Sequence, residues 1–469
     1  MNPYRSAIFS TIILLLSVSL ATGTTVPIKS YSLDVSFTPE RGLMTGEAVM
    51  LPDYVGKTPD SITFYLHGEL SVDSVKVGNQ TIDTRQTQVE FFYDYSLLAN
   101  EIAIPLENVD RQENIEMFYS GHFAPSDARS PSDYMRIDSG GVFLRGYCYS
   151  LWFPVSLEDR SDGYLSDFID VKLRTPEDFT SIFVGNRLKV YQENGQNVSQ
   201  WQSLNTSIIN VQCTAQRYVE ATLGSVTAYF SDDPNTRKQV DRILEAVQLM
   251  LAMYSERYKK DAAVDQFHIM ETPPFADISA GNVTGLTADR WRNPEAYEGL
   301  KTTAAHELVH AFVDIDVPRS DPLFALAIEG FAVFFDIPAV AGDFGSDSYN
   351  EVMVRVEKNY LKRRTDGIDK YQRKLPVEKP MADIGPDEVG RYKDRFVLAD
   401  RSLLFLNYLQ KEMGSDKFLK FLSELFNSGP KTYNSFIRLC EQFAPGIEKD
   451  IRLWMETTEY PDRFMLAKL

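Results

Sequence analysis

Apolar residues change their spacing near position 233, and this change constrains the fold more than any other feature of the sequence. In residues 26–230 they alternate with polar residues over short runs, such as 31–37, 62–66 and 169–173. Glycine, proline, asparagine and aspartate separate these runs. Such alternation is typical of strands with one buried and one solvent-facing side, so this part is predicted to be an antiparallel β domain.

Beyond position 233 the apolar residues recur at helical spacing. Asp233 can cap a helix and Pro234 can occupy its first position. Further helices are expected at 294–313, 322–335, 400–413, 416–426 and 433–443. The predicted fold class is α+β and multidomain, with a β domain at 26–230, a mainly helical domain at 233–469 and a boundary near 228–235.

Composition narrows the class of protein. The 469 residues suffice for two or three domains, and 43% hydrophobic residues are ordinary for a globular chain. The net charge of −18 gives no general attraction to phosphate backbones or anionic membranes, so no nucleic-acid partner is expected. Three cysteines are too few for a disulfide scaffold. Cys148 and Cys213 lie in strand-like segments and could pair, which would leave Cys440 free.

The first residues have the pattern of a secretory signal peptide. Arg5 precedes an almost wholly apolar run at 7–20, and Ser19 and Ala21 supply the small residues of a cleavage site. The run is shorter than the ~20 residues of a membrane-spanning helix. Residues 1–21 are therefore predicted to be a signal peptide and the protein to be secreted or extracytoplasmic, without stable membrane insertion. An uncleaved signal would instead anchor it.

Two histidines one helical turn apart form the first part of a candidate site. His306 and His310 enclose Glu307 in the sequence HELVH. Side chains at i and i+4 lie on one face of a helix, so both imidazoles can reach one ion. Glu307 lies close enough to meet a water on that ion without being a ligand itself.

Glu329 is the third candidate ligand. It is the one charged residue in segment 323–335, which is apolar all round and therefore predicted to be buried. A buried carboxylate without a positive partner costs several kcal/mol, and no Lys or Arg lies within a helical turn. A divalent metal would compensate the charge.

Two imidazoles and one carboxylate favour zinc, because calcium and magnesium prefer shells of oxygen ligands. Three protein ligands leave a fourth position for water, as in catalytic zinc sites. Zinc would lower the pKa of that water and polarise a carbonyl, while Glu307 would take the proton and deliver it to a leaving amine. The sequence thus predicts a zinc-dependent hydrolase acting on a peptide or protein substrate.

The motif at 306–310, followed after 18 residues by Glu329 within IEGFA, is similar to that of the gluzincin metallopeptidases of the membrane-alanyl-aminopeptidase and leukotriene-hydrolase type. Residues 31–46 and the WFP segment at 152–154 are also similar. The resemblance implies a β-rich saddle domain followed by a thermolysin-like catalytic domain. It also implies His306, His310 and Glu329 as zinc ligands and Glu307 as general base.

Several positions depart from the pattern of that family. The family's G-x-M-E-N motif, whose glutamate grips the α-amine of the substrate, falls on 279–283, so Asn282 replaces that glutamate as the expected substrate contact. Tyr392 is the best match for the tyrosine that stabilises the oxyanion, although the K-G-A that usually follows is missing. Tyr360 and Tyr371 are the next candidates. Asp336 could orient a zinc ligand. A short form without the helical C-terminal domain of many relatives is expected.

Two other functions stay open. The first is a true aminopeptidase that anchors the α-amine through other acids, such as Glu271 or Asp277. The second is a zinc-binding interaction protein that does not hydrolyse peptides. The presence of Glu307 argues against this second function, because a binding module has no use for a positioned base. The sequence carries no signal for a particular oligomeric state.

Overall fold

A computed structural model gives the fold. It describes residues 26–54, 59–92, 96–106, 113–123, 135–145, 150–156, 165–207, 211–258, 266–272, 278–292, 305–306, 308–309, 317–318, 320–341, 345–368, 374–385, 388, 397–428 and 432–466. The predicted signal segment 1–21 and Cys148 lie outside these residues. Cys213 is a buried free thiol. Within the described ranges, no helix combines the length and the apolar character needed to cross a membrane.

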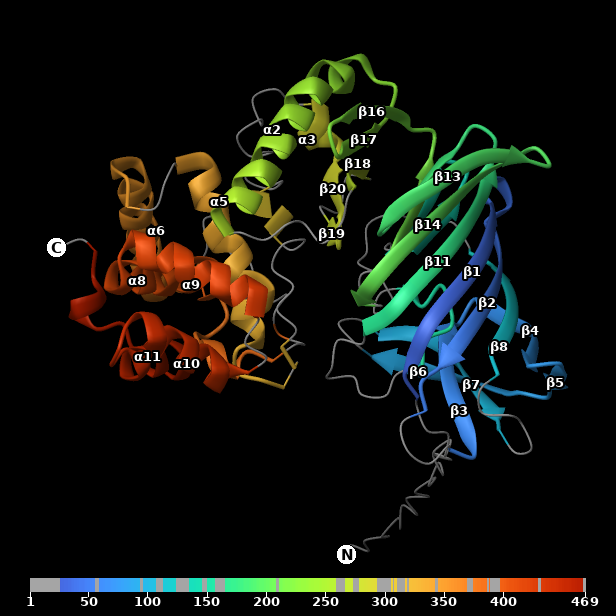
Figure 1. The fold of residues 1–469 in the computed structure, drawn as a ribbon, viewed down its shortest axis with the longest axis horizontal. Coiled ribbons are helices and arrows are strands. Elements are labelled where there is room, and N and C mark those ends of the chain that lie inside the picture. Colours follow the sequence, from blue (N-terminus) through green and yellow to red (C-terminus); the bar gives the residue numbers. More distant parts are fainter. Residues whose placement is uncertain are drawn as a thin grey trace, which may run out of the picture.

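The amino-terminal part is built from strands (Figure 1). The largest sheet has eight strands in the order β13-β14-β11-β1-β2-β8-β4-β5. Their bounds are β1 (Ile28–Thr38), β2 (Leu43–Pro52), β4 (Leu70–Val77), β5 (Gln80–Ile82), β8 (Ile115–His122), β11 (Leu165–Pro176), β13 (Asn186–Glu193) and β14 (Gln196–Ser207). A four-stranded sheet, β12-β15-β10-β9, comprises β9 (Met135–Asp138), β10 (Gly141–Leu144), β12 (Thr180–Phe183) and β15 (Cys213–Gln216). A three-stranded sheet, β3-β7-β6, comprises β3 (Ser61–His67), β6 (Arg85–Phe92) and β7 (Ser96–Pro105).

The alternation in the sequence sets which face of these strands is buried. In β1 the side chains of Tyr31, Leu33 and Val35 are 1%, 2% and 0% exposed, as the period of two predicts. The pairing is mostly antiparallel, as expected, but β1 and β11 run parallel to each other. A parallel neighbour needs a long crossover connection, and the segment between β1 and β11 supplies it with the strands in between.

The second part begins with its own sheet. Five strands lie in the order β16-β17-β18-β20-β19. They are β16 (Val219–Leu223), β17 (Val226–Phe230), β18 (Phe267–Thr272), β19 (Ile278–Ala280) and β20 (Val283–Thr287). Because β17 pairs with β18, β16 and β17 belong to this sheet. The change of sheet therefore falls between β15 and β16, earlier than the boundary expected near 228–235, where only the change from strand to helix occurs.

Helices form the rest of the second part (Figure 1). The first, α2 (Pro234–Tyr258), begins as predicted, with Asp233 Oδ1 accepting hydrogen bonds from the backbone N–H of Asn235 at 2.8 Å and of Thr236 at 3.2 Å. The others are α3 (Ala288–Arg292), α5 (Phe331–Ala341), α6 (Asp347–Asp366), α8 (Ser402–Met413), α9 (Ser415–Ser428), α10 (Tyr433–Phe443) and α11 (Glu448–Glu456). Helices α8, α9 and α10 lie where they were predicted; α6 and α11 were not predicted individually. The fold is thus α+β and multidomain.

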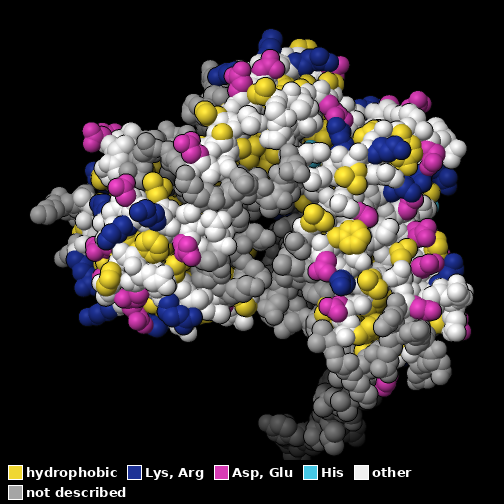
Figure 2. Space-filling model, in the orientation of Figure 1, with side chains coloured by type: hydrophobic (Ala, Val, Ile, Leu, Met, Phe, Trp, Pro, Cys, Tyr) yellow, Lys and Arg dark blue, Asp and Glu magenta, His cyan; other side chains and the backbone are white. Residues whose placement is uncertain are grey.

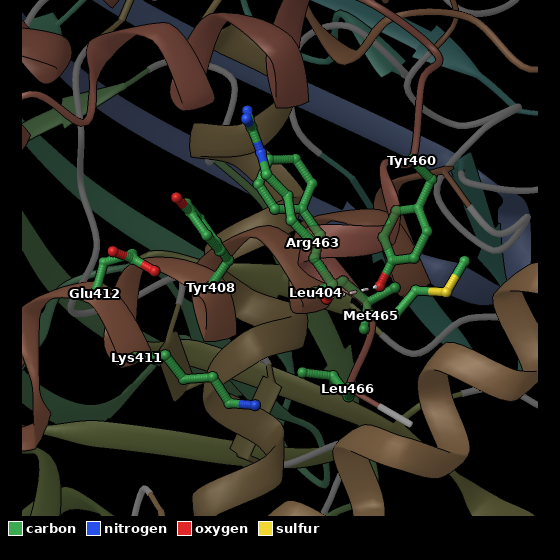
Figure 3. A pocket seen from close by; sticks show the side chains of 9 residues that line it. Leu404, Tyr408, Lys411, Glu412, Tyr460, Arg463, Met465 and Leu466 are labelled. Atoms are coloured by element: carbon green, nitrogen blue, oxygen red, sulfur yellow. Dashed lines mark hydrogen bonds between the residues drawn. The ribbon is translucent and has the colours of Figure 1, made fainter. Parts of the chain in front are cut away.

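The carboxyl-terminal segment after α11 packs onto α8. A cavity of about 100 Å³ lies between them, lined by Leu404 and Tyr408 of α8 and by Tyr460, Arg463 and Leu466 of the carboxyl-terminal segment. Figure 3 shows the side chains that line it. On the face of the molecule shown in Figure 2, basic side chains are mixed with acidic ones rather than gathered into a patch.

Candidate metal centre

The first predicted ligand, His306, lies on a buried helical segment. Residues 305–306 and 308–309 are helical, and Ala305, Leu308 and Val309 are 0%, 0% and 2% exposed. The side chain of His306 keeps 12% of its surface exposed. An apolar helix face therefore anchors this segment in the core, while the imidazole stays within reach of solvent.

Glu329 lies on a neighbouring helix that contains a π-helical turn, η5 (Leu326–Gly330). The backbone N–H of Phe331 donates to the carbonyl of Leu326, five residues earlier, so one extra residue is inserted before α5. Glu329 is 6% exposed in an otherwise apolar segment. Single π turns inside α-helices are frequent at functional sites.

The structure brings these two side chains together. His306 Nε2 lies 3.5 Å from Glu329 Oε2. Two donors on a tetrahedral zinc at ~2.0–2.2 Å are separated by about 3.4 Å, so the observed distance suits two ligands of one ion. An imidazole nitrogen and a carboxylate oxygen are also the donor types that catalytic zinc sites use.

Tyr254 of α2 ties the two ligand-bearing helices together. Its hydroxyl lies 3.4 Å from the carbonyl oxygen of Ala305 and 3.4 Å from that of Phe335. The tyrosine is 0% exposed, so this link is part of the core. The helical spacing in the sequence identified Tyr254 as a core position, but nothing in the sequence indicated that it joins these helices.

The other predicted members of the site lie outside the described residues, namely Glu307, His310, Tyr371 and Tyr392. The backbone of Asp336 is part of α5, whereas its side chain is outside them. Accordingly, among the residues that the structure describes, no cluster of three His, Cys, Asp or Glu side chains surrounds a metal position. Two of the three predicted ligands are described, and they are adjacent.

Asn282, the expected substrate contact, is hydrogen-bonded to backbone groups. It is 1% exposed, and its Oδ1 accepts a hydrogen bond from Gly185 N at 2.6 Å. Its Nδ2 donates to Gly185 O at 2.8 Å and to Gln266 O at 2.6 Å. Both amide hydrogens are therefore committed to backbone carbonyls. Because Gly185 belongs to the β domain, Asn282 links the two domains in this structure.

His268 lies in the same contact between the two domains, the domain seam formed by Gly185, His268 and Asn282. Its Nε2 lies 3.2 Å from Gly185 O and its Nδ1 lies 3.1 Å from the hydroxyl of Tyr229. Burial, with a further contribution from Arg187, lowers the pKa of His268 to about 3. The imidazole therefore stays neutral, with one nitrogen donating to the carbonyl and the other accepting from the tyrosine.

Two alternative site residues are engaged elsewhere. Glu271, a candidate anchor for an α-amine, accepts hydrogen bonds from Ser231 N at 2.8 Å and pairs with Arg292 Nη2 at 3.0 Å. Tyr360, a candidate oxyanion donor, is 0% exposed and donates to Glu378 Oε1 at 2.5 Å. Burial raises the pKa of Tyr360 to about 12. Asp277, the other candidate anchor, lies outside the described residues.

Comparison with known proteins places this geometry in a known fold. No family model and no curated protein matches the sequence. The solved M1 zinc metallopeptidase from Deinococcus radiodurans covers 93% of this chain and 95% of its own, with a TM-score of 0.66 and 14% sequence identity. The yeast LTA4 hydrolase covers 94% of this chain and 69% of its own, with a TM-score of 0.68 and 14% identity. The chain therefore has the fold of the M1 zinc metallopeptidases.

Proposed function

We propose that the protein is an exported zinc metallopeptidase of the gluzincin type. The observation that carries the proposal is the 3.5 Å approach of His306 Nε2 to Glu329 Oε2. The two residues come from separate helices, and the fold is shared with solved zinc metallopeptidases. The histidine belongs to an HELVH sequence, which would supply the remaining ligand, His310, from the next turn of the same helix.

Each residue of the proposed site has a distinct role. His306, His310 and Glu329 would hold zinc, which when bound lowers the pKa of a coordinated water and polarises the scissile carbonyl. Glu307 would accept the proton of the attacking water and pass it to the leaving amine. Tyr392 would donate a hydrogen bond to the developing oxyanion. Asp336 would orient one of the ligands.

We propose that the protein recognises the amino terminus of its substrate only weakly. An aminopeptidase must hold a free α-amine near the scissile bond, and a buried ammonium needs an anionic partner. Asn282 carries no charge and its amide is used at the domain seam. Glu271 is already paired with Arg292. The protein should therefore accept peptides with a blocked amino terminus and cleave some internal bonds.

Two alternatives differ from this proposal in measurable ways. An aminopeptidase with a different anchor, such as Asp277, would release single residues from the amino terminus. A zinc-binding interaction protein would hold the metal but hydrolyse nothing. The presence of Glu307 beside His306 favours hydrolysis, because a general base serves no purpose in a binding site.

Export is proposed from the sequence of residues 1–21. A positive charge, an apolar run and small residues at the expected cleavage site form the pattern of a secretory signal. The amino terminus of the secreted protein, determined by mass spectrometry, tests this proposal. A terminus near position 22 is expected, whereas an intact Met1 in the exported protein would indicate an uncleaved anchor.

Elemental analysis of the purified protein tests the metal assignment. About one zinc per chain is expected, since three protein ligands define one site. The double variant His310→Ala, Glu329→Ala should lose the zinc while far-ultraviolet circular dichroism shows that its secondary structure is kept. Zinc that remains in this double variant would refute the assigned ligands. A peptide library incubated with each protein then separates a peptidase from a binding protein.

A further inference from the structure

Two π-helical turns pack against each other in the core of the helical part. The first, η5, carries Glu329. The second, η8 (Val397–Arg401), leads directly into α8. The two turns are in contact, and η5 also contacts α8. A π turn inserts one residue and rotates the following side chains by about 100°, so the position of the π turn decides where Glu329 points.

Gly330 lies directly against the start of α8. A Cβ atom built on Gly330 would lie 2.8 Å from Ser402 Oγ, 3.0 Å from Ser402 Cβ and 2.5 Å from Leu326 Cδ1. The leucine methyl can move, whereas Ser402 is 0% exposed at the first residue of α8. Ser402 therefore rests against the backbone next to the metal ligand, and only glycine allows this contact.

Arg401 holds the second turn in place. Its guanidinium is 0% exposed and donates to three backbone carbonyls at and just beyond the end of α11: Trp454 at 3.0 Å, Thr457 at 2.6 Å and Glu459 at 3.2 Å. Its Nη1 also donates to Tyr360 and pairs with Glu378 at 3.1 Å. These contacts join residues far apart in the sequence at one buried charge. An arginine bound on so many sides fixes the backbone that carries it.

A second ion pair holds η8 through the preceding residue, Asp400. Asp400 Oδ2 lies 2.6 Å from Arg363 Nη1 on α6, and Asp400 is 7% exposed. Two consecutive residues of the same turn are thus tied to α6, and Arg401 is tied in addition to the end of α11 and the segment after it. The turn cannot shift without breaking one of these contacts.

We propose that η8 positions the metal ligand: Ser402, held by the buried Arg401 and Asp400 contacts, rests on Gly330 and fixes the orientation of Glu329. Gly330, Ser402 and Arg401 are therefore positioning residues that act on zinc affinity through Glu329. This inference rests on the proposed zinc site, and it adds that the segment after α11 contributes to metal binding through Arg401.

A double-mutant cycle at the contact tests the inference. Gly330→Ala should weaken zinc binding about 10–100-fold, the usual effect of disturbing a group that orients a metal ligand. Ser402→Gly in the same chain removes both serine atoms that the new Cβ would meet and leaves the movable Leu326 methyl, so it should restore the affinity to within a few-fold of the wild type. The readout is the zinc dissociation constant from competition with a chelator, together with thermal unfolding of the metal-free protein.

Gly385→Ala is the matched control, because a Cβ at Gly385 meets no atom within 4 Å. It should leave zinc affinity unchanged. If Gly330→Ala does not fold, Ser402→Thr approaches the same contact from the other side and should also weaken zinc binding. Wild-type zinc affinity in Gly330→Ala, or a loss that Ser402→Gly does not restore, would overturn the inference. Failure of the wild type to bind zinc would instead overturn the proposed function along with it.

Discussion

Replacing Asn282 by aspartate gives the sharpest test of its assignment to the domain seam. The substitution keeps the shape of the side chain and the bond from Gly185 N to Oδ1. It replaces the amide NH2, which donates to Gly185 O at 2.8 Å and Gln266 O at 2.6 Å, by an oxygen facing both carbonyls. At 1% exposure, an ionised carboxylate there is repelled by both acceptors without help from water.

The expected loss of folding stability follows from the free energy needed to protonate the new carboxyl group. Starting from an ordinary pKa of about 3.9, protonation at about pH 7.5 costs roughly 5 kcal/mol, and at about pH 5.5 roughly 2 kcal/mol. Loss of one of the two N–H···O bonds adds about 1 kcal/mol. Asn282→Asp should therefore be destabilised by up to about 6 kcal/mol at the higher pH and about 3 kcal/mol at the lower one.

The sign of the pH dependence is specific. The folded-state pKa of the introduced carboxyl lies above its unfolded-state value, so the folded state binds more protons. Stability relative to the wild type is then highest at low pH and falls as the pH rises toward the folded-state pKa. Asn282→Ala, which deletes three hydrogen bonds and adds no charge, should lose about 3 kcal/mol at both pH values.

Urea unfolding followed by tryptophan fluorescence measures these differences, since the Trp201 ring lies 5.1 Å from His268 at the seam. Asn79→Asp is the control: Asn79 is exposed in the turn between β4 and β5, and the change should stay within about 0.5 kcal/mol. An Asn282→Asp variant that is as stable as the wild type at both pH values would refute the seam assignment. A selective gain of activity on free-amine peptides in that variant would restore the substrate contact, because the new carboxylate could then pair with the α-amine.

The remaining predictions concern catalysis. Glu307→Gln should keep zinc and the fold but lower the hydrolysis rate by about 10²–10⁴, because an amide cannot accept the proton of the water; near-normal turnover would remove Glu307 from the mechanism. Tyr392→Phe should lower kcat by about 10²–10³ with little change in KM, as expected for a donor that acts in the transition state; a silent substitution would assign that role elsewhere. Matched free and N-acetylated peptides should have similar kcat/KM values, and a preference above about 100-fold for the free amine would favour the aminopeptidase.

Local patterns predicted the regular parts of the fold. The bounds of α10 agree with the expected 433–443, and its Thr432 cap accepts from Ser435 N. Helix α6 was not predicted individually, and its buried stripe includes a carboxylate, Glu357. That carboxylate is buried because Tyr460 Oη and Leu466 N each donate to it at 2.7 Å. Both partners lie about a hundred residues away in the sequence, so no local pattern could indicate them.

The candidate site was predictable only in part, for a similar reason. The spacing of two histidines identified His306, and isolation in an apolar segment identified Glu329. The structure places His306 Nε2 3.5 Å from Glu329 Oε2. The π turns that orient Glu329 depend on tertiary contacts such as Gly330 with Ser402, and periodicity does not reveal them. The role of Asn282 depends on Gly185, a glycine in another domain. The two residues approach each other only in the folded chain, so no sequence pattern indicates this contact.

Zinc titration of the metal-free protein tests the central claim most directly. The protein is stripped with a chelator, zinc is added back in known amounts, and hydrolysis of an internally quenched peptide is followed at each step. The account predicts no hydrolysis without metal and a rate that rises in proportion to zinc, reaching its plateau at about one zinc per chain. Hydrolysis that persists in the metal-free protein, or a folded and zinc-loaded protein that cleaves no peptide in a mixed library, would contradict it.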